Sequence, residues 1–172
     1  IKIAKQVITN SNGEYRAEDV AIITPYTGQA RAIQDLKSTQ MELTGVTVGT
    51  VDSFQGSERK ITIVSTTRSM KHASGFIRDE GRTNVQITRF SHGCIVVGNA
   101  EVMKTCGGFW AELTTVINTK GGLRTVEADS EYDSDSATPV RELAGGLMER
   151  ASISSVKIVA GSNYVKYGLA RW

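Results

Sequence analysis

The sequence predicts an α/β fold in which a parallel sheet is covered by helices on both faces. Short apolar runs recur along the first two thirds of the chain, each run is continuous, and segments with helical spacing separate the runs. Continuous apolar runs are typical of strands buried on both faces, as in parallel sheets. Because ligands of such sheets bind at the carboxyl ends of the strands, we expect functional residues directly after the runs.

The first predicted strand covers residues 20–24, where an apolar run is stopped by Pro25. A helix is predicted from residue 29 to about residue 39, because apolar residues recur there at helical spacing. Thr27 is expected to cap the start of this helix with its hydroxyl.

The following segments continue the alternation of strands and helices. Residues 46–51 are β-branched and apolar, which favours a strand, and the polar residues after them end it. Gly93 is expected to end a helix, after which a fourth buried strand begins. The remaining predicted elements are strands at 46–51, 61–66 and 94–98 and helices at 82–90 and 109–118.

The composition is that of a globular protein of ordinary polarity, with 40% hydrophobic and 22% charged residues. The formal charge of +2 is too small to predict a nucleic-acid or membrane partner from bulk electrostatics, so any polyanion site must be local. No apolar run approaches the roughly 18 residues of a membrane span. We expect one soluble folded domain, which can carry a tail, and no membrane partner.

Cysteine and histidine are scarce, which bears on metal binding and on the cell compartment. Cys94 and Cys106, with His72 and His92, do not form the usual four-ligand zinc set. We therefore expect free thiols, no metal site and an intracellular protein of the nucleus or cytoplasm. The chain starts at Ile1 without an initiator Met, so we also expect a fragment that is truncated at its N-terminus.

Charge and composition divide the chain into a folded body, a linker and an extension. The body contains nearly all of the periodic apolar segments, whereas the linker carries alternating acidic residues from Glu127 to Asp135. Charge repulsion and poor burial favour disorder there. The extension is expected to be irregular, although 152–159 and 163–169 can form short strands. The predicted boundaries are 1–119, 120–142 and 143–172.

Three groups of polar residues follow predicted strands. In the first group, Thr24 and Pro25 lead through a turn into a helix, whose free amides can attract an anion such as phosphate. The alternative is purely structural, because Pro25 can simply end the strand while Gly28 permits the turn.

The second group lies between two strands, from Gly49 to Glu58. Thr50 and Ser53 offer hydroxyls that can hydrogen-bond a nucleic-acid phosphate. Gly56 lets a ligand approach the backbone, and Glu58 can accept a hydrogen bond from a sugar hydroxyl. The alternative is an ordinary strand connection without a ligand.

The third group is placed on the predicted helix 82–90. Arg82, Gln86 and Arg89 share one helical face, which predicts a basic stripe, while Val85 and Ile87 can point towards the sheet. Arg89 can present a forked guanidinium to the terminal phosphate of a nucleotide. The alternative is a solvated helix face with surface arginines.

Taken together, the three groups resemble motifs IV, V and VI of the Up-frameshift-type superfamily 1 helicases, which include Senataxin and the immunoglobulin-mu-binding helicase. The combination of VDSFQG, NVQITR and IVVGN is far more specific than a lone Gly-rich loop. The segments that carry the resemblance are IITPYTGQ at 22–29, VGTVDSFQGSERKITIVSTTRS at 48–69 and GFIRDEGRTNVQITRFSHGCIVVGN at 75–99.

The resemblance implies a RecA-like sheet of the P-loop NTPase fold, as the second domain of a two-domain motor. Such a motor binds ATP with Mg between its domains and single-stranded RNA or DNA across both. By position, Arg89 resembles the arginine finger of an ATP-dependent helicase. The residues that resemble nucleotide contacts are Gln55, Gly56, Glu58, Arg82 and Arg89. Those that resemble nucleic-acid backbone contacts are Thr24, Pro25, Thr50 and Ser53.

The sequence also departs from the family pattern. Gly81 stands where the family often has the first arginine of a pair, and Gln86 replaces a usual small residue. No G-x-x-x-x-G-K-[ST] phosphate loop occurs, since that loop belongs to the first RecA-like domain, the expected partner. We therefore expect no ATP hydrolysis by this chain alone. An alternative function stays open, that of a degenerate helicase-like module acting as a non-catalytic binding or interaction platform.

Overall fold

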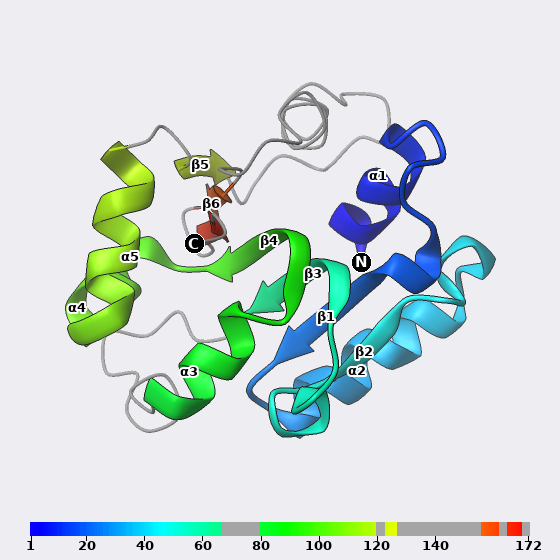
Figure 1. The fold of residues 1–172 in the computed structure, drawn as a ribbon, viewed down its shortest axis with the longest axis horizontal. Helices are drawn as coiled ribbons and strands as arrows, with labels where there is room; N and C mark the ends of the chain where they lie inside the picture. Colours follow the sequence, from blue (N-terminus) through cyan, green and yellow to red (C-terminus); the bar gives the residue numbers. More distant parts are fainter. Residues whose placement is uncertain (67–79, 120–122, 127–155, 162–164, 170–172) are drawn as a thin grey trace.

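The computed structural model describes residues 1–66, 80–119, 123–126, 156–161 and 165–169. Its centre is a sheet with the strand order β2-β1-β3-β4-β7-β5-β6 (Figure 1). Four neighbouring strands are parallel, in agreement with the predicted α/β class and with a RecA-like sheet. They are β1 Val20–Thr24, β2 Thr47–Thr50, β3 Arg59–Ser65 and β4 Phe90–Gly98.

Three further strands extend the sheet beyond β4. Strand β7 (Val165–Leu169) pairs antiparallel with both β4 and β5 (Leu123–Val126), and β5 pairs parallel with β6 (Val156–Gly161). Strands β6 and β7 overlap the segments 152–159 and 163–169, for which short strands were the alternative to an irregular extension. Strand β5 falls inside the predicted linker range, whose acidic part lies outside the described residues, so the linker itself stays a prediction.

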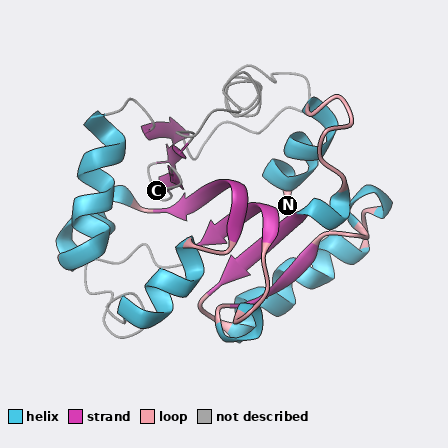
Figure 2. Ribbon diagram, in the orientation of Figure 1, coloured by secondary structure: helices cyan, strands magenta, loops and turns pink. Residues whose placement is uncertain are grey.

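Helices flank the sheet, as Figure 2 shows. Short 3-10 turns occur at 17–19, 41–43 and 52–54. Within the described residues, no helix has the length and the apolar character needed to cross a membrane. The α-helices are α1 Lys2–Asn10, α2 Thr27–Ser38, α3 Glu80–Ile87, α4 Ala100–Cys106 and α5 Gly108–Thr119.

Alternate strand residues pack into two separate sets of apolar contacts, one on each face of the sheet. In β1, Val20 and Ile22 pack with Ala4 and Val7 of α1. Ala21 and Ile23 point to the other face, because successive strand side chains alternate. There they pack with Val51, Phe54 and Val85. Further along that second face, residues of α3, α4 and α5 cover β3 and β4, with Val64, Val96, Ile87, Met103 and Trp110 among the buried side chains.

The structure corrects several predicted boundaries. Helix α2 begins at Thr27, and its N-cap is Tyr26 without a side-chain hydrogen bond, so Thr27 is the first helical residue and not the cap. Helix α3 ends at Ile87, and β4 already begins at Phe90, because the ladder with β3 starts at the pair Arg59 and Phe90. Gly93 consequently lies inside a strand.

Candidate functional site

The carboxyl ends of β1 and β2 bring the first two predicted groups together. Thr24 and Thr50, the last residues of these strands, are paired in the ladder. The backbone N–H of Val51 donates to the carbonyl of Thr24 at 3.3 Å. Ser53 lies in the 3-10 turn that follows, and its hydroxyl donates to the carbonyl of Thr50 at 2.7 Å. We call this region, defined by Thr24, Thr50 and Ser53, the carboxyl edge.

Burial separates the four residues that were predicted to contact a nucleic-acid backbone. Thr24 is 0% exposed and Pro25 is also buried, whereas Thr50 is half-buried and Ser53 is exposed. The side chains of Thr24 and Pro25 are therefore covered by the protein itself, and their role as nucleic-acid contacts stays a prediction. Thr50 and Ser53 are the two members of the set that are not buried.

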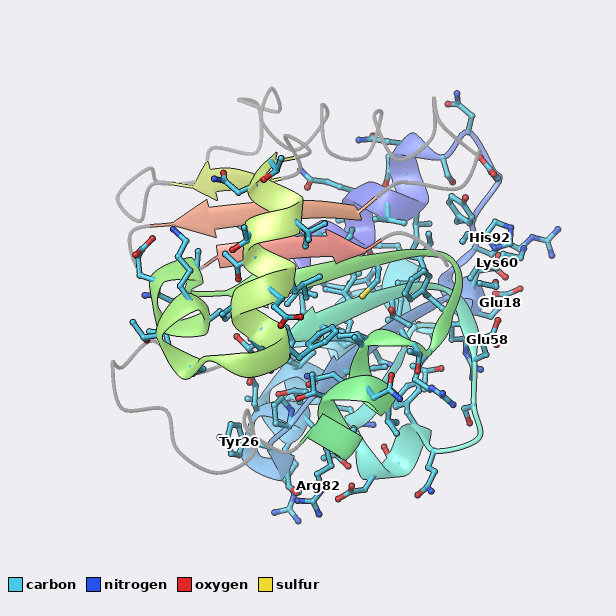
Figure 3. All side chains as sticks on the ribbon, turned by 60° about the vertical axis from the view of Figure 1, so that its left-hand side comes forward. Glu18, Tyr26, Glu58, Lys60, Arg82 and His92 are labelled. Carbon is cyan, nitrogen blue, oxygen red and sulfur yellow. The ribbon has the colours of Figure 1, made fainter. Side chains whose placement is uncertain are left out.

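Glu58 and Arg89 lie at the opposite end of the strands, which we call the amino edge. Glu58 directly precedes β3 and Arg89 directly precedes β4. The backbone N–H of Arg59 donates to the carbonyl of Arg89 at 3.1 Å, so the two strands start side by side. Figure 3 shows Glu58 and Tyr26, which belong to the two edges, on different sides of the molecule. Glu58 and Arg89 therefore lie at the edge opposite to Thr24 and Thr50.

Two segments, 51–58 and 80–89, run along the same face of the sheet from the carboxyl edge to the amino edge. At one end, Arg82 Nε lies 3.3 Å from Asp52 Oδ1. In the middle, Val85 packs against the cluster that contains Phe54. We call these segments the crossing pair. All the residues predicted to contact a nucleotide belong to it, namely Gln55, Gly56, Glu58, Arg82 and Arg89.

Two glycines shape the segment 51–58. A Cβ atom at Gly49 would overlap the hydroxyl of Ser53 and press against the ring of Phe54, so glycine lets the turn 52–54 lie directly on β2. Gly56 adopts a φ of +81°, a conformation that favours glycine, and a Cβ there would have no atom within 4 Å. The backbone beside the exposed Gln55 is therefore open to a close approach.

The guanidinium group of Arg89 makes few hydrogen bonds with the described residues. It is half-buried, and its Nε is buried without a hydrogen-bond partner. Its Nη2 donates to Thr88 Oγ1 at 2.9 Å. Within the described residues, no carboxylate forms an ion pair with Arg89. A buried guanidinium nitrogen without a partner is costly, so an anionic ligand at this position would stabilise it.

The predicted basic stripe on α3 is wrong. Thr83, Gln86 and Ile87 are 3%, 2% and 7% exposed, so the face that turns towards the sheet carries these residues at helical spacing. Gln86 therefore points inwards, and its Nε2 finds no hydrogen-bond partner among the described residues. Arg82 remains exposed, and Arg89 lies beyond the end of the helix.

Sequence reasoning did not single out Gln29 as a functional residue. Thr24 Oγ1 donates to Gln29 Oε1 at 2.8 Å, and Gln29 Nε2 donates to Ser65 Oγ at 2.9 Å. The amide thus joins the ends of β1 and β3 from the first turn of α2. The signal was present, since Gln29 ends the segment IITPYTGQ, but the partner Ser65 is 36 residues away.

Metal binding by the protein alone has no support in the described part of the chain. No group of three or more His, Cys, Asp or Glu side chains that could hold a metal ion is found among residues 1–66 and 80–119.

A family model described as an AAA domain, AAA_12, matches residues 1–101, which is more than half of the chain. The chain belongs to this family. The match covers β1 to β4, and therefore both edges and the crossing pair. The domain is also similar to curated helicases.

Three relatives illustrate this similarity. DNA polymerase alpha-associated DNA helicase A of Saccharomyces cerevisiae is 38% identical over 109 residues, which are 62% of this chain and 16% of that protein. ATP-dependent helicase upf1 of Schizosaccharomyces pombe is 40% identical over 105 residues, 58% of this chain and 11% of that protein. Helicase sen1 of the same organism is 32% identical over 116 residues, 65% of this chain and 7% of that protein.

These matches confirm the resemblance stated from the motifs, so the chain carries a superfamily 1 helicase domain of the Up-frameshift type. The chain spans between 7% and 16% of the length of these three relatives.

Proposed function

We propose that the chain is the second RecA-like domain of an ATP-dependent helicase that acts on single-stranded RNA or DNA. ATP with Mg binds between this domain and a first RecA-like domain of the same parent protein. Two of the relatives support the choice of reaction, because one is named an ATP-dependent helicase and another a DNA helicase.

The observation that carries the proposal is the environment of Arg89. Its Nε is buried without a partner, and the described residues supply it with no carboxylate. The position is fixed by the bond between the Arg59 N–H and the Arg89 carbonyl. A guanidinium held in this way suits the terminal phosphate of ATP, where negative charge spreads over several oxygens during phosphoryl transfer. We assign Arg89 the role of arginine finger.

The rest of the crossing pair contributes to the same nucleotide site. Gln55 and Glu58 are exposed, and Gly56 offers a backbone without a covering side chain. Glu58 can accept a hydrogen bond from a ribose hydroxyl, because an ionised carboxylate is an acceptor only. Arg82, which contacts Asp52, can supply a second positive charge near the start of α3.

The carboxyl edge is proposed to bind the nucleic-acid backbone. Thr50 and Ser53 carry accessible hydroxyls, and contacts of hydroxyls to phosphate oxygens position a strand without reading its sequence. Thr24 and Pro25 act indirectly, since their buried side chains fix the chain on which these hydroxyls lie. Because the crossing pair joins the two edges, closure of the two domains around ATP can be linked through it to movement of the bound nucleic acid.

Comparison of this chain with the full-length parent protein tests the assignment of two domains. The purified chain is expected to hydrolyse no ATP, whereas the parent protein is expected to hydrolyse ATP when single-stranded RNA or DNA is present. Turnover by the chain alone would show that the division into two domains is wrong. A parent protein that binds the strand but never hydrolyses ATP would favour the alternative, a non-catalytic binding platform.

A further inference from the structure

The side chain of Gln29 connects three elements at the carboxyl edge. It belongs to the first turn of α2, and it receives a hydrogen bond from the hydroxyl at the end of β1 (Thr24, 2.8 Å). Its amide nitrogen donates to the hydroxyl at the end of β3 (Ser65, 2.9 Å). Both functional groups of the amide are therefore used, which fixes its orientation.

The start of α2 lacks a side-chain cap. Its N-cap, Tyr26, makes no side-chain capping hydrogen bond, and Pro25 provides no backbone N–H. Thr27 and Gly28 are exposed. The Gln29 side chain reaches back from α2 to the end of β1, so it contributes to holding the turn between these two elements.

The contacts of Gln29 also extend to the residues that are proposed to contact the nucleic acid. Thr24 is paired with Thr50 and accepts the N–H of Val51, which opens the segment that carries Ser53. A displacement of Thr24 would consequently displace the hydroxyls of Thr50 and Ser53. Gln29 holds Thr24 from the side opposite to β2, because its second bond is to β3.

We propose that Gln29 is a positioning residue for the phosphate backbone of a single-stranded nucleic acid. It holds the exposed turn 26–28 and the hydroxyls of Thr50 and Ser53 in one arrangement, so that they meet neighbouring phosphates of the same strand. This inference rests on the proposed function of the carboxyl edge. Gln29 itself carries no charge and contributes through the groups it fixes.

The test measures the affinity of the full-length protein for a fluorescent single-stranded oligonucleotide. Gln29→Ala is compared with Gln34→Ala, which changes an exposed glutamine on the same helix. We expect Gln29→Ala to weaken binding by about tenfold, the size of effect given by the loss of two neutral hydrogen bonds. Gln34→Ala is expected to leave the affinity unchanged.

Two further readouts separate positioning from a general loss of structure. The slope of log affinity against log salt concentration is expected to stay the same in Gln29→Ala, because no phosphate-neutralising charge is removed. Ser65→Ala removes only the hydrogen bond between Gln29 and Ser65, so it should weaken oligonucleotide binding less than Gln29→Ala does. The loss of binding free energy in the double variant should be smaller than the sum of the losses in the two single variants.

The possible results have distinct meanings. If the wild-type protein does not bind the oligonucleotide, the proposed function of the carboxyl edge fails. If it binds and Gln29→Ala binds equally well, with or without a lower thermal midpoint, the positioning role is refuted. If Gln29→Ala does not fold, Ser65→Ala decides, and an unchanged affinity in that folded variant refutes the role as well.

Discussion

The backbone N–H of Arg59 donates to the carbonyl of Arg89, and this contact places Glu58 and Arg89 at the starts of neighbouring strands. The two segments involved are separated by about a quarter of the folded body in sequence, yet they reach the same edge of the sheet. A carboxylate that can bind a sugar hydroxyl and a guanidinium that can bind a phosphate are thereby available to one nucleotide.

Gly49 is predicted to be essential for the packing of the turn 52–54 against β2. Replacing Gly49 by Ala places a Cβ on the Ser53 hydroxyl and against the ring of Phe54, which is 3% exposed. We expect Gly49→Ala to lower the free energy of unfolding by about 1–3 kcal/mol, as overpacking does. Chemical denaturation of the purified chain measures this.

Gly28 provides the matched control for that substitution. It lies in the first turn of α2, and a Cβ there would meet no atom within 4 Å. Gly28→Ala is expected to be neutral or to stabilise the chain by up to about 1 kcal/mol, because alanine loses less backbone entropy in a helix. Equal destabilisation by both substitutions would contradict the close packing inferred at Gly49.

The ion pair between Asp19 and Lys60 predicts a pH dependence of stability. Lys60 Nζ lies 3.1 Å from Asp19 Oδ1, and the backbone N–H of Arg16 donates to Asp19 Oδ2 at 3.0 Å. Partial burial acts to raise the pKa of Asp19, but the hydrogen bonds from Arg16 and Lys60 and their positive charges outweigh it and lower that pKa.

A lowered folded-state pKa means that the carboxylate stabilises the fold above its unfolded pKa, and that this contribution is lost as pH falls through the folded pKa. Asp19→Asn should remove up to about 1 kcal/mol of this pH-dependent stability, a small value because the Lys60 side chain is only half-buried. Urea midpoints between neutral and acidic pH measure it. If the variant and the wild type lose stability in parallel on acidification, the ion pair does not contribute.

The two cysteines are predicted to differ in reactivity. Burial raises the pKa of the Cys94 thiol to about 12. Cys94 is 0% exposed, whereas Cys106 is half-buried near the end of α4. Because the thiolate is the reactive form, a thiol reagent near pH 8 should modify Cys106 first and Cys94 only when the fold opens.

Mass spectrometry of the labelled chain at successive times distinguishes the two sites. Cys106→Ser should abolish the fast phase and leave a slow phase that accelerates with denaturant. Labelling of Cys94 at a rate similar to that of Cys106, without denaturant, would show that β4 is less well covered than the structure indicates.

The parallel strands could be predicted from sequence because each contains β-branched or apolar residues in succession, although β2 (TVGT) is only half-buried. Those runs gave the class of fold, and the spacing of polar residues after β1 and β2 gave the carboxyl edge. The boundaries of α3 and β4 were missed, since the start of β4 at Phe90 depends on pairing with Arg59, a contact that local periodicity does not encode. Helix α4 was also missed, although Asn99 caps it with hydrogen bonds to Glu101 and Val102.

The side-chain directions at the site were harder to predict than its members. A helical-wheel argument placed Gln86 with the arginines, but the packing of α3 turned it inwards. The sequence between β2 and β3 did not indicate that this connection crosses the sheet and places Glu58 at the amino edge. The contact of Gln29 with Ser65 joins residues on α2 and β3, so it required the three-dimensional arrangement of these elements.

The most direct test of the proposed function is the ATP turnover of the full-length protein that carries Arg89→Ala, measured with saturating single-stranded RNA or DNA. Arg31→Ala, an exposed arginine on α2, is the control. If Arg89 is the arginine finger, turnover falls by about a thousandfold or more in Arg89→Ala, while strand affinity and the control stay close to wild type. Turnover within a few-fold of wild type, or a loss confined to strand binding, would contradict this assignment.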